Sequence, residues 1–429
     1  MDLWYNGEKV PIEREKRMNH RMDRSRFLIG AYCLQPYAGS DAHVRDIAAC
    51  HIDFMVAVGR GMEETLDAFA TYGVGAIVNG VVPGWWVGTG QNGNMAVLNP
   101  IDTYTAAAEA FRDHPAIWGI DAGDEPSLAD FDHYGKVVEL MNRAFPHQFA
   151  YLNLCPSYGI IADNGEEAIL AQLGTASYEE YLTQACEKIP TDYLCYDFYQ
   201  YSFPDTAEGI AKALENLRIA SDVARKHGKS LWIVLQVNSH RPDAWISEGQ
   251  LRYQAFSAMA FGVEAILWAC YTAGWFYHNV LDEKGEKTQQ YDRLQAVNTA
   301  LHTLGKPYMN YRTVATYGVG FDEACNLPTS DSFTNTVFCS VKEESGKPLL
   351  IGDMVSREKD HASRALFLCA AADPLGCHAG VSRLVFAAAE GWRVSAFGGN
   401  GPISLTPSED GLYRVTIPDG DGILLVAEP

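Results

Sequence analysis

The chain alternates short apolar segments with longer segments in which apolar residues recur at helical spacing. Eight of the short segments are rich in β-branched and aromatic residues and lack a strict apolar–polar alternation. This pattern is typical of parallel strands that are buried on both faces. We predict these strands at residues 27–35, 52–58, 74–82, 116–122, 148–154, 192–199, 230–237 and 263–271.

Helical segments separate these strands, and several have recognisable ends. The segment 128–141 begins at the capping-box-like pair Ser127 and Asp130, and a later helix begins at Ser247. Gly228 follows another helical segment, as expected of a C-terminal glycine. A final helix, 289–304, precedes a Gly-Lys-Pro sequence that is typical of a domain boundary.

Eight such βα units match an α/β fold of the (β/α)8 TIM barrel type. The alternative is a doubly wound open sheet, but no GxGxxG motif follows the first strand to support its dinucleotide-binding version. Beyond Met309, short strands separated by Gly, Pro and Asp predict a smaller all-β sandwich domain. We therefore predict a lead-in segment at 1–25, a barrel at 26–308 and a sandwich at 309–429.

Composition and charge narrow the classes of partner. The 429 residues include 47% apolar residues, enough for large cores, and a net charge of −21 disfavours nucleic acid and anionic membrane surfaces. The ten cysteines are scattered without a CxxC pair, and no segment is long and apolar enough to span a bilayer. We therefore expect a cytoplasmic protein, and the sequence leaves open whether it forms a homo-oligomer.

The chemistry expected at the C-terminal ends of barrel strands, where such enzymes hold their active sites, comes from carboxylates, amides and aromatic rings. Histidines that could form a metal site do not cluster, and the glycine-rich loop after the third strand lacks a lysine. We therefore expect neither a metal nor a cofactor. Amides, carboxylates and aromatic rings suit a carbohydrate substrate, because sugars present hydroxyl groups and apolar CH faces. The candidate substrate-binding residues are Tyr32, Asn79, Trp85, Trp86, Asn153, Tyr199, Gln236, Asn238, Tyr271 and Trp275.

The fourth predicted strand runs into Trp118-Gly-Ile-Asp-Ala-Gly-Asp-Glu-Pro126. This segment resembles the fourth strand of clan A glycoside hydrolases, whose β-galactosidase-like members also carry a β-sandwich after the barrel. The resemblance implies that Glu125 is the general acid/base, that Asp124 binds the substrate, and that the eighth strand supplies an aromatic platform. The order of strands and helices is similar over residues 26–305. The one specific motif of the resemblance is short.

The sequence departs from that family at the seventh strand, where the family places a nucleophilic glutamate. Gln236 stands there instead, and an uncharged amide cannot act as a nucleophile. Asp197, at the end of the sixth strand, is the best substitute for the second carboxylate that glycosidic cleavage needs. The sequence therefore predicts a glycosidase that cleaves an O-glycosidic bond in a small glycoside or oligosaccharide, with Glu125 and Asp197 as its catalytic residues.

Structural roles and other functions stay open at this point. Glu125 could cap the following helix, and Asp197 could simply hold neighbouring tyrosines in place. One alternative function is a carbohydrate-binding barrel that has lost catalysis. Another is a sugar-acid lyase or isomerase in which Glu125 abstracts a proton.

Overall fold

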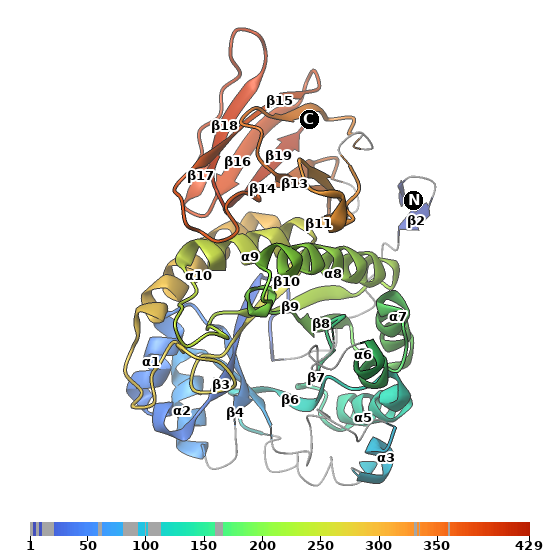
Figure 1. Cartoon of the computed structure of the whole chain (residues 1–429), viewed down its shortest axis with the longest axis vertical. Coiled ribbons are helices and arrows are strands. Elements are labelled where there is room, and N and C mark those ends of the chain that lie inside the picture. Colours follow the sequence, from blue (N-terminus) through green and yellow to red (C-terminus); the bar gives the residue numbers. More distant parts are fainter. Residues whose placement is uncertain are drawn as a thin grey trace.

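The computed structural model describes residues 3–5, 8–10, 21–58, 62–79, 93–98, 100–101, 113–158, 166–329, 333, 335–358 and 361–429. Within these residues the chain forms a (β/α)8 barrel followed by a β-sandwich that packs on one side of it (Figure 1). The predicted fold class is therefore confirmed.

All eight predicted barrel strands are present, and they are parallel. Their sheet order is β7-β6-β5-β4-β3-β10-β9-β8, and a single bridge between Leu154 and Tyr196 joins the two ends of the sheet. The Leu154 N–H donates to the Cys195 carbonyl at 2.9 Å across this closure. The strands are β3 (Leu28–Leu34), β4 (Phe54–Val58), β5 (Gly75–Val78), β6 (Ile117–Asp124), β7 (Phe149–Asn153), β8 (Tyr193–Asp197), β9 (Ser230–Gln236) and β10 (Val263–Ala269).

The barrel strands bury apolar side chains on both faces, which explains their near-continuous hydrophobic pattern. Alternate residues point inward and fill the barrel with aromatic rings, such as Phe149, Tyr193 and Trp232. The Tyr193 and Trp232 rings stack with their centroids 4.6 Å apart. The other face of each strand packs against the surrounding helices in a larger apolar cluster. Side chains thus fill the barrel up to its C-terminal end.

The helices that the sequence predicted are present, with differences at their ends, whereas α1, α3, α6 and α7 were not predicted. Ser247 and Gln250 form a reciprocal capping box at the start of α9, as the sequence indicates. Asp130 does not close a capping box; its carboxylate instead accepts hydrogen bonds from the N–H groups of Gly93 and Met95. The helices are α1 (Asp41–Ala49), α2 (Glu63–Tyr72), α3 (Met95–Leu98), α5 (Phe131–Ala144), α6 (Glu166–Leu173), α7 (Tyr178–Lys188), α8 (Thr206–Lys226), α9 (Glu248–Ala260) and α10 (Gln289–Tyr308).

The sandwich has a six-stranded sheet, β11-β13-β14-β19-β16-β17, and a three-stranded sheet, β12-β15-β18. The sequence did not predict β11, which follows α10 after two residues, the short β17, or the N-terminal hairpin of β1 (Leu3–Tyr5) and β2 (Glu8–Val10). The sandwich strands are β11 (Tyr311–Val319), β12 (Phe338–Glu343), β13 (Leu349–Ser356), β14 (Arg364–Ala370), β15 (Val381–Ala388), β16 (Arg393–Gly398), β17 (Gly401–Ile403), β18 (Tyr413–Pro418) and β19 (Gly422–Glu428).

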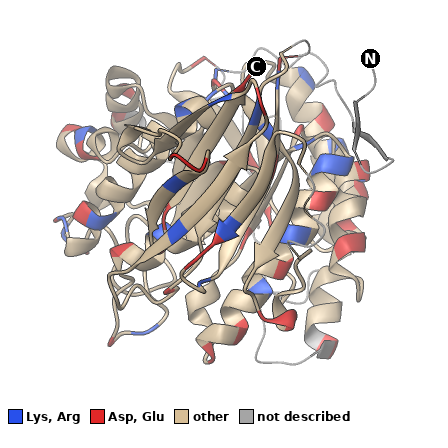
Figure 2. Cartoon of the chain, turned by 90° about the horizontal axis from the view of Figure 1, so that it is seen from above, with Lys and Arg blue, Asp and Glu red and all other residues tan. Residues whose placement is uncertain are grey.

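The sandwich packs on α9 and α10 through apolar and polar contacts. The Tyr308 ring at the end of α10 meets Phe367 edge to face at 5.5 Å, and the Thr316 hydroxyl donates to the Ala260 carbonyl at 3.0 Å. Arg252 of α9 pairs with Asp421 at 3.0 Å. Viewed from the sandwich, charged residues of both signs lie on the helices around the barrel (Figure 2). Of the helices in the described part of the chain, none combines the length and apolarity needed to cross a membrane.

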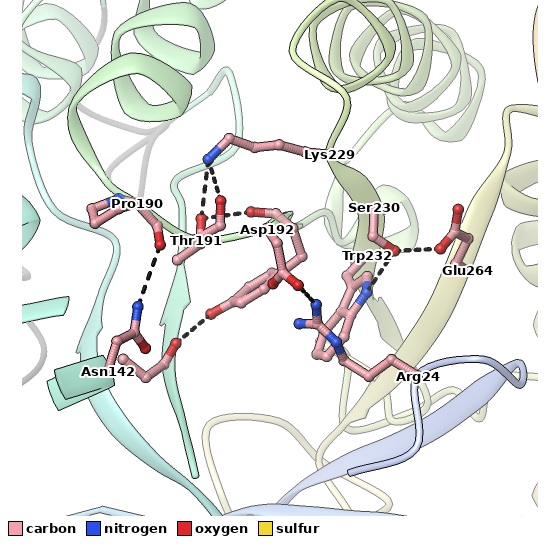
Figure 3. A network of polar contacts seen from close by, with 11 residues as sticks. Arg24, Asn142, Pro190, Thr191, Asp192, Lys229, Ser230, Trp232 and Glu264 are labelled. Carbon is pink, nitrogen blue, oxygen red and sulfur yellow. Dashed lines mark hydrogen bonds and ion pairs between the residues drawn. The ribbon is translucent and has the colours of Figure 1, made fainter. Parts of the chain in front are cut away.

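A polar network ties together the N-terminal ends of the barrel strands (Figure 3). Arg24 forms an ion pair with Asp192, and its guanidinium lies over the Trp232 ring at 5.6 Å. The Trp232 indole donates to the Ser230 hydroxyl at 3.1 Å, which in turn donates to Glu264 at 2.5 Å. These contacts join the segment before β3 to β8, β9 and β10 at the end of the barrel that is associated with stability.

We predict that Arg24→Ala lowers the free energy of unfolding by about 2 to 4 kcal/mol, because it breaks a pair whose arginine is buried. Only 8% of the Arg24 side chain is exposed. Urea unfolding followed by circular dichroism measures the loss. The matched control is Arg241→Ala, whose pair with Asp243 is exposed on both sides and should contribute little to stability. Equal losses in the two variants would contradict the role of Arg24.

Candidate active site

An irregularity in β6 brings two aspartates to the inner face of the barrel. The register of β6 against β7 shifts between Asp121 and Gly123, so that Asp121 lies beside Tyr151 and Asp124 lies beside Asn153. In a regular strand, residues three apart point to opposite faces. The extra residue of the bulge therefore lets both carboxyl groups point into the barrel, and bulges often redirect a side chain in this way near active sites.

Glu125 follows β6 with a left-handed backbone (φ 51°), which is uncommon for a residue with a side chain. Its main chain is held on both sides. Its N–H donates to the Asn153 carbonyl at 2.9 Å, and its carbonyl accepts hydrogen bonds from Gln172 and Cys155, each at 3.3 Å. With the backbone fixed in this way, the Glu125 side chain is buried and hydrogen-bonds to Asp197 at the end of β8.

Asn153, at the end of β7, bridges the carboxyl groups on either side of it. Its amide nitrogen donates to Asp124 Oδ1 at 3.1 Å and to Asp197 Oδ1 at 2.9 Å. The Cys195 thiol donates to its amide oxygen at 3.6 Å, which fixes the orientation of the amide. Asp124, Glu125, Asn153 and Asp197 therefore form one connected polar cluster, which we call the carboxyl cluster.

The environment raises the pKa of the aspartates in this cluster. Burial raises the pKa of Asp197 to about 6, although its hydrogen bonds to Asn153 and Glu125 lower it in part. Burial and the charge of Asp197 raise the pKa of Asp124 to about 8. Asp121, below them, has a pKa well above its usual value because of burial and the nearby Asp124. Near neutral pH the cluster therefore holds protons, as closely spaced acids must.

Aromatic rings line one side of the carboxyl cluster. The Tyr32 hydroxyl is 2.5 Å from that of Tyr151, and the edge of Trp275 meets the Tyr32 ring at 6.2 Å. In the same loop as Trp275, Phe276 meets Tyr199 at 5.1 Å. Trp275 is 48% exposed, which leaves its ring available for contact with a ligand. Tyr32, Tyr199 and Trp275 are thus placed together, near the carboxyl groups.

Sequence reasoning missed Tyr151 and Phe276 in this region. Tyr151 lies two residues before Asn153 on β7, so the period of a strand places both on the inner face. That signal was available in the sequence. Phe276 carried no comparable signal, because its position depends on the fold of the loop after β10.

The other predicted substrate-binding residues lie outside the carboxyl cluster, and two of them fall outside the described residues. The fully buried Gln236 accepts a hydrogen bond from the Tyr201 N–H at 3.1 Å, and Asn238 accepts one from the Cys270 N–H at 3.0 Å. Tyr271 is fully buried in the apolar cluster on the helix side of the barrel. Asn79 is half-buried at the end of β5, while Trp85 and Trp86 fall outside the described residues.

In the described part of the chain, no group of three or more His, Cys, Asp or Glu side chains is arranged to hold a metal ion. The carboxyl groups of the cluster instead bond to one another and to Asn153. Their arrangement suits proton transfer, because an acid and a conjugate base lie in direct contact in a buried site.

We predict that Asp124→Asn stabilises the fold at high pH, because it removes a buried group that ionises there. The amide oxygen of the new side chain can still accept the hydrogen bond from Asn153. Folding raises the Asp124 pKa from 3.8 to about 8, so the folded chain holds this proton more tightly than the unfolded chain. The wild type therefore loses stability as the pH rises through this range. Urea unfolding should show a gain of about 1 kcal/mol or more at pH 8 and none below pH 4.

The control for this prediction is Asp243→Asn. Asp243 is an exposed aspartate whose pKa the nearby Arg241 lowers, so this variant should show no gain at pH 8. A gain for Asp124→Asn that does not change with pH would show that burial of its charge is not the cause.

No protein-family model and no curated protein sequence matches the chain. Its structure is similar to Gan42B, a GH42 β-galactosidase from G. stearothermophilus, over 95% of this chain and 99% of that one, with a TM-score of 0.50 and 8% identity. The xylanase Xyn30A from Clostridium acetobutylicum aligns over 94% and 96%, with a TM-score of 0.47 and 10% identity. In its fold, a barrel with a following sandwich, the chain thus resembles clan A glycoside hydrolases.

Proposed function

We propose that this chain is a glycoside hydrolase that cleaves an O-glycosidic bond of a small glycoside or oligosaccharide. Glu125 acts as the general acid/base, and Asp197 is the second carboxylate. The observation that carries this proposal is the contact between the two carboxyl groups, from β6 and β8, at the C-terminal end of the barrel. Two facing carboxyl groups are what glycosidic hydrolysis requires.

The hydrogen bond between Glu125 and Asp197 supports one acid and one base in the resting site, because two ionised carboxylates cannot share such a bond. With a pKa of about 6, Asp197 is mainly ionised at neutral pH, and its carboxylate can then accept the hydrogen bond from Glu125 that lowers this pKa. Asp124 stays largely neutral, since its pKa is about 8. Its neutrality limits the negative charge beside Asp197 and lets that group remain a carboxylate.

The spacing of the pair bears on the stereochemistry. A direct hydrogen bond brings the carboxyl groups closer than the roughly 5–5.5 Å of retaining enzymes or the 6.5–9.5 Å of inverting ones. The substrate must therefore break this bond on entry. Retention requires the smaller of the two separations, and so the smaller movement of the two groups, and we therefore propose this route. Asp197 then attacks the anomeric carbon while Glu125 protonates the leaving oxygen, and Glu125 later activates the water that releases the sugar.

The substrate proposed here is held by aromatic and polar groups. The exposed ring of Trp275 suits stacking against the CH face of a sugar, and Asp124 and Asn153 offer partners for its hydroxyl groups. All ten cysteines are free, which supports our proposal of a reducing compartment, the cytoplasm.

We predict that Glu125→Gln lowers kcat/KM at least about a hundredfold on natural glycosides, the scale that general acid catalysis supplies. The loss should be smaller on aryl glycosides with good leaving groups, which need less protonation. Asp197→Asn should lose activity on both kinds of substrate, because it removes the nucleophile itself. Steady-state assays of released sugar and released aryl alcohol measure these losses.

Asp243→Asn is the matched control, a carboxylate-to-amide change at an exposed position after β9 that should keep wild-type kinetics. Full activity of Glu125→Gln on natural glycosides would refute the assignment. Calorimetric sugar binding without release of sugar from a broad substrate panel would instead favour a carbohydrate-binding barrel without catalysis.

We also predict that the first-formed product keeps the anomeric configuration of the substrate. Proton NMR of the reducing end, recorded within minutes of adding enzyme, separates the two anomers before mutarotation mixes them. An initial product of opposite configuration would show that Asp197 acts on water, and would require the two carboxyl groups to move about 6.5 Å or more apart.

A further inference from the structure

Two free cysteines lie side by side at the C-terminal end of the barrel. The pairing of β3 with β10 runs up to Ala31 and Trp268, and two further residues along each strand bring Cys33 next to Cys270. The Tyr271 N–H donates to the Tyr32 carbonyl at 2.8 Å, so the two chains stay together beyond the regular strands. The two sulfurs lie close together, because a Cβ at Gly274 would be within 3.6 Å of both.

The two thiols differ in their access to solvent. Cys33 is half-buried, whereas Cys270 is fully buried behind it. A small reagent can therefore reach Cys33 first, and Cys270 is then the group that reacts with the modified Cys33. The two exposed cysteines, Cys339 and Cys377, instead donate to backbone carbonyls within their own segments.

The loop that carries Trp275 lies directly over this pair of sulfurs. A Cβ added to Gly274 would lie 2.6 Å from Cys270 Sγ and 3.6 Å from Cys33 Sγ, so only glycine fits there. The Trp275 N–H hydrogen-bonds to the Cys270 sulfur. The position of the aromatic ring therefore depends on the sulfur of Cys270.

We propose that Cys33 and Cys270 form a redox modification site, at which a small-molecule disulfide converts the two thiols into an intramolecular disulfide and so displaces the Trp275 loop. The register of β3 and β10 places the two cysteines next to each other. Their unequal exposure means that Cys33 reacts with the reagent before Cys270 does. Gly274 and Trp275 connect the two sulfurs to the aromatic side of the site. None of these features depends on glycosidase activity.

The reaction is a double thiol–disulfide exchange. The Cys33 thiolate attacks one sulfur of the reagent R–S–S–R, forms a mixed disulfide and releases one R–S⁻. Cys270 then loses its proton and attacks the Cys33 sulfur, which releases the second R–S⁻. Two protein thiols are oxidised to one disulfide, and the reagent is reduced to two thiols.

Formation of the Cys33–Cys270 disulfide changes the contacts that hold the loop with Trp275. A disulfide holds its sulfurs about 2.05 Å apart, closer than two thiols joined by a hydrogen bond. The two sulfurs must therefore move closer together, and any shift of the Cys270 sulfur changes its contact with the Trp275 N–H. We expect a weaker aromatic contact with the sugar and a rise in KM of about fivefold. This effect on KM rests on the proposed function.

The test uses the full chain with Cys339→Ser and Cys377→Ser, which removes the two exposed thiols. Oxidised glutathione is the reagent, and remaining thiols are alkylated before peptide mass mapping. We expect the Cys33 and Cys270 peptides to be linked, with the loss of two hydrogens, and the link to be reversed by dithiothreitol. Tryptophan fluorescence should change on oxidation, and this change should be absent when Trp275→Phe is added.

Two variants keep the test decisive. Cys33→Ser should form no link and show no change in fluorescence, and Cys270→Ser should stop at a glutathione adduct on Cys33. Cys33→Ala replaces the first variant if the serine prevents folding.

Unlinked thiols after prolonged oxidation would overturn the proposal, as would a link that leaves the fluorescence of Trp275 unchanged. If the chain hydrolyses no glycoside, the mass and fluorescence measurements still decide this proposal separately from the proposed function.

Discussion

The site depends on the ability of Asn153 to hold two carboxyl groups that would otherwise repel each other. Its amide donates to Asp124 and Asp197 at once, while the third acid, Glu125, bonds to Asp197 directly. Burial makes ionisation of all these groups costly, so the cluster keeps protons that isolated carboxyl groups would lose near neutral pH. A polar cluster of this kind functions only if each member is supported, and the bulge in β6 and the left-handed backbone of Glu125 provide that support.

The two ends of the barrel divide the tasks of stability and chemistry. At the N-terminal end, an ion pair, a cation–π contact and short hydrogen bonds join neighbouring strands. This network extends into the sandwich, because Arg357 pairs with Glu264 at 2.6 Å. At the C-terminal end, Glu125 has a left-handed backbone, and burial raises the pKa of Asp124 and Asp197, so that ionising these groups costs stability. Such a division lets the barrel tolerate a destabilising site, because the opposite end and the sandwich hold the strands in register.

Much of the fold could be predicted from local pattern. The eight barrel strands were each marked by a short apolar segment, and the capping box at Ser247 was readable from residue identity. Local pattern failed where distant contacts decide the outcome. Asp130 looks like part of a capping box, but its carboxylate holds the main chain of Gly93 and Met95. Likewise, the sequence gives no signal that the Gln236 side chain accepts a hydrogen bond from the Tyr201 N–H.

The sequence by itself determined which chemical groups end the barrel strands: two acidic residues at the end of β6, an asparagine at the end of β7, an aspartate at the end of β8 and an amide in place of an acid at the end of β9. Only the tertiary structure decided which of these groups meet. The contact of Glu125 with Asp197, and that of Cys33 with Cys270, depend on strand register, on one bulge and on the closure of the sheet. These are set by packing between residues far apart in the chain, for which no local pattern carries a signal.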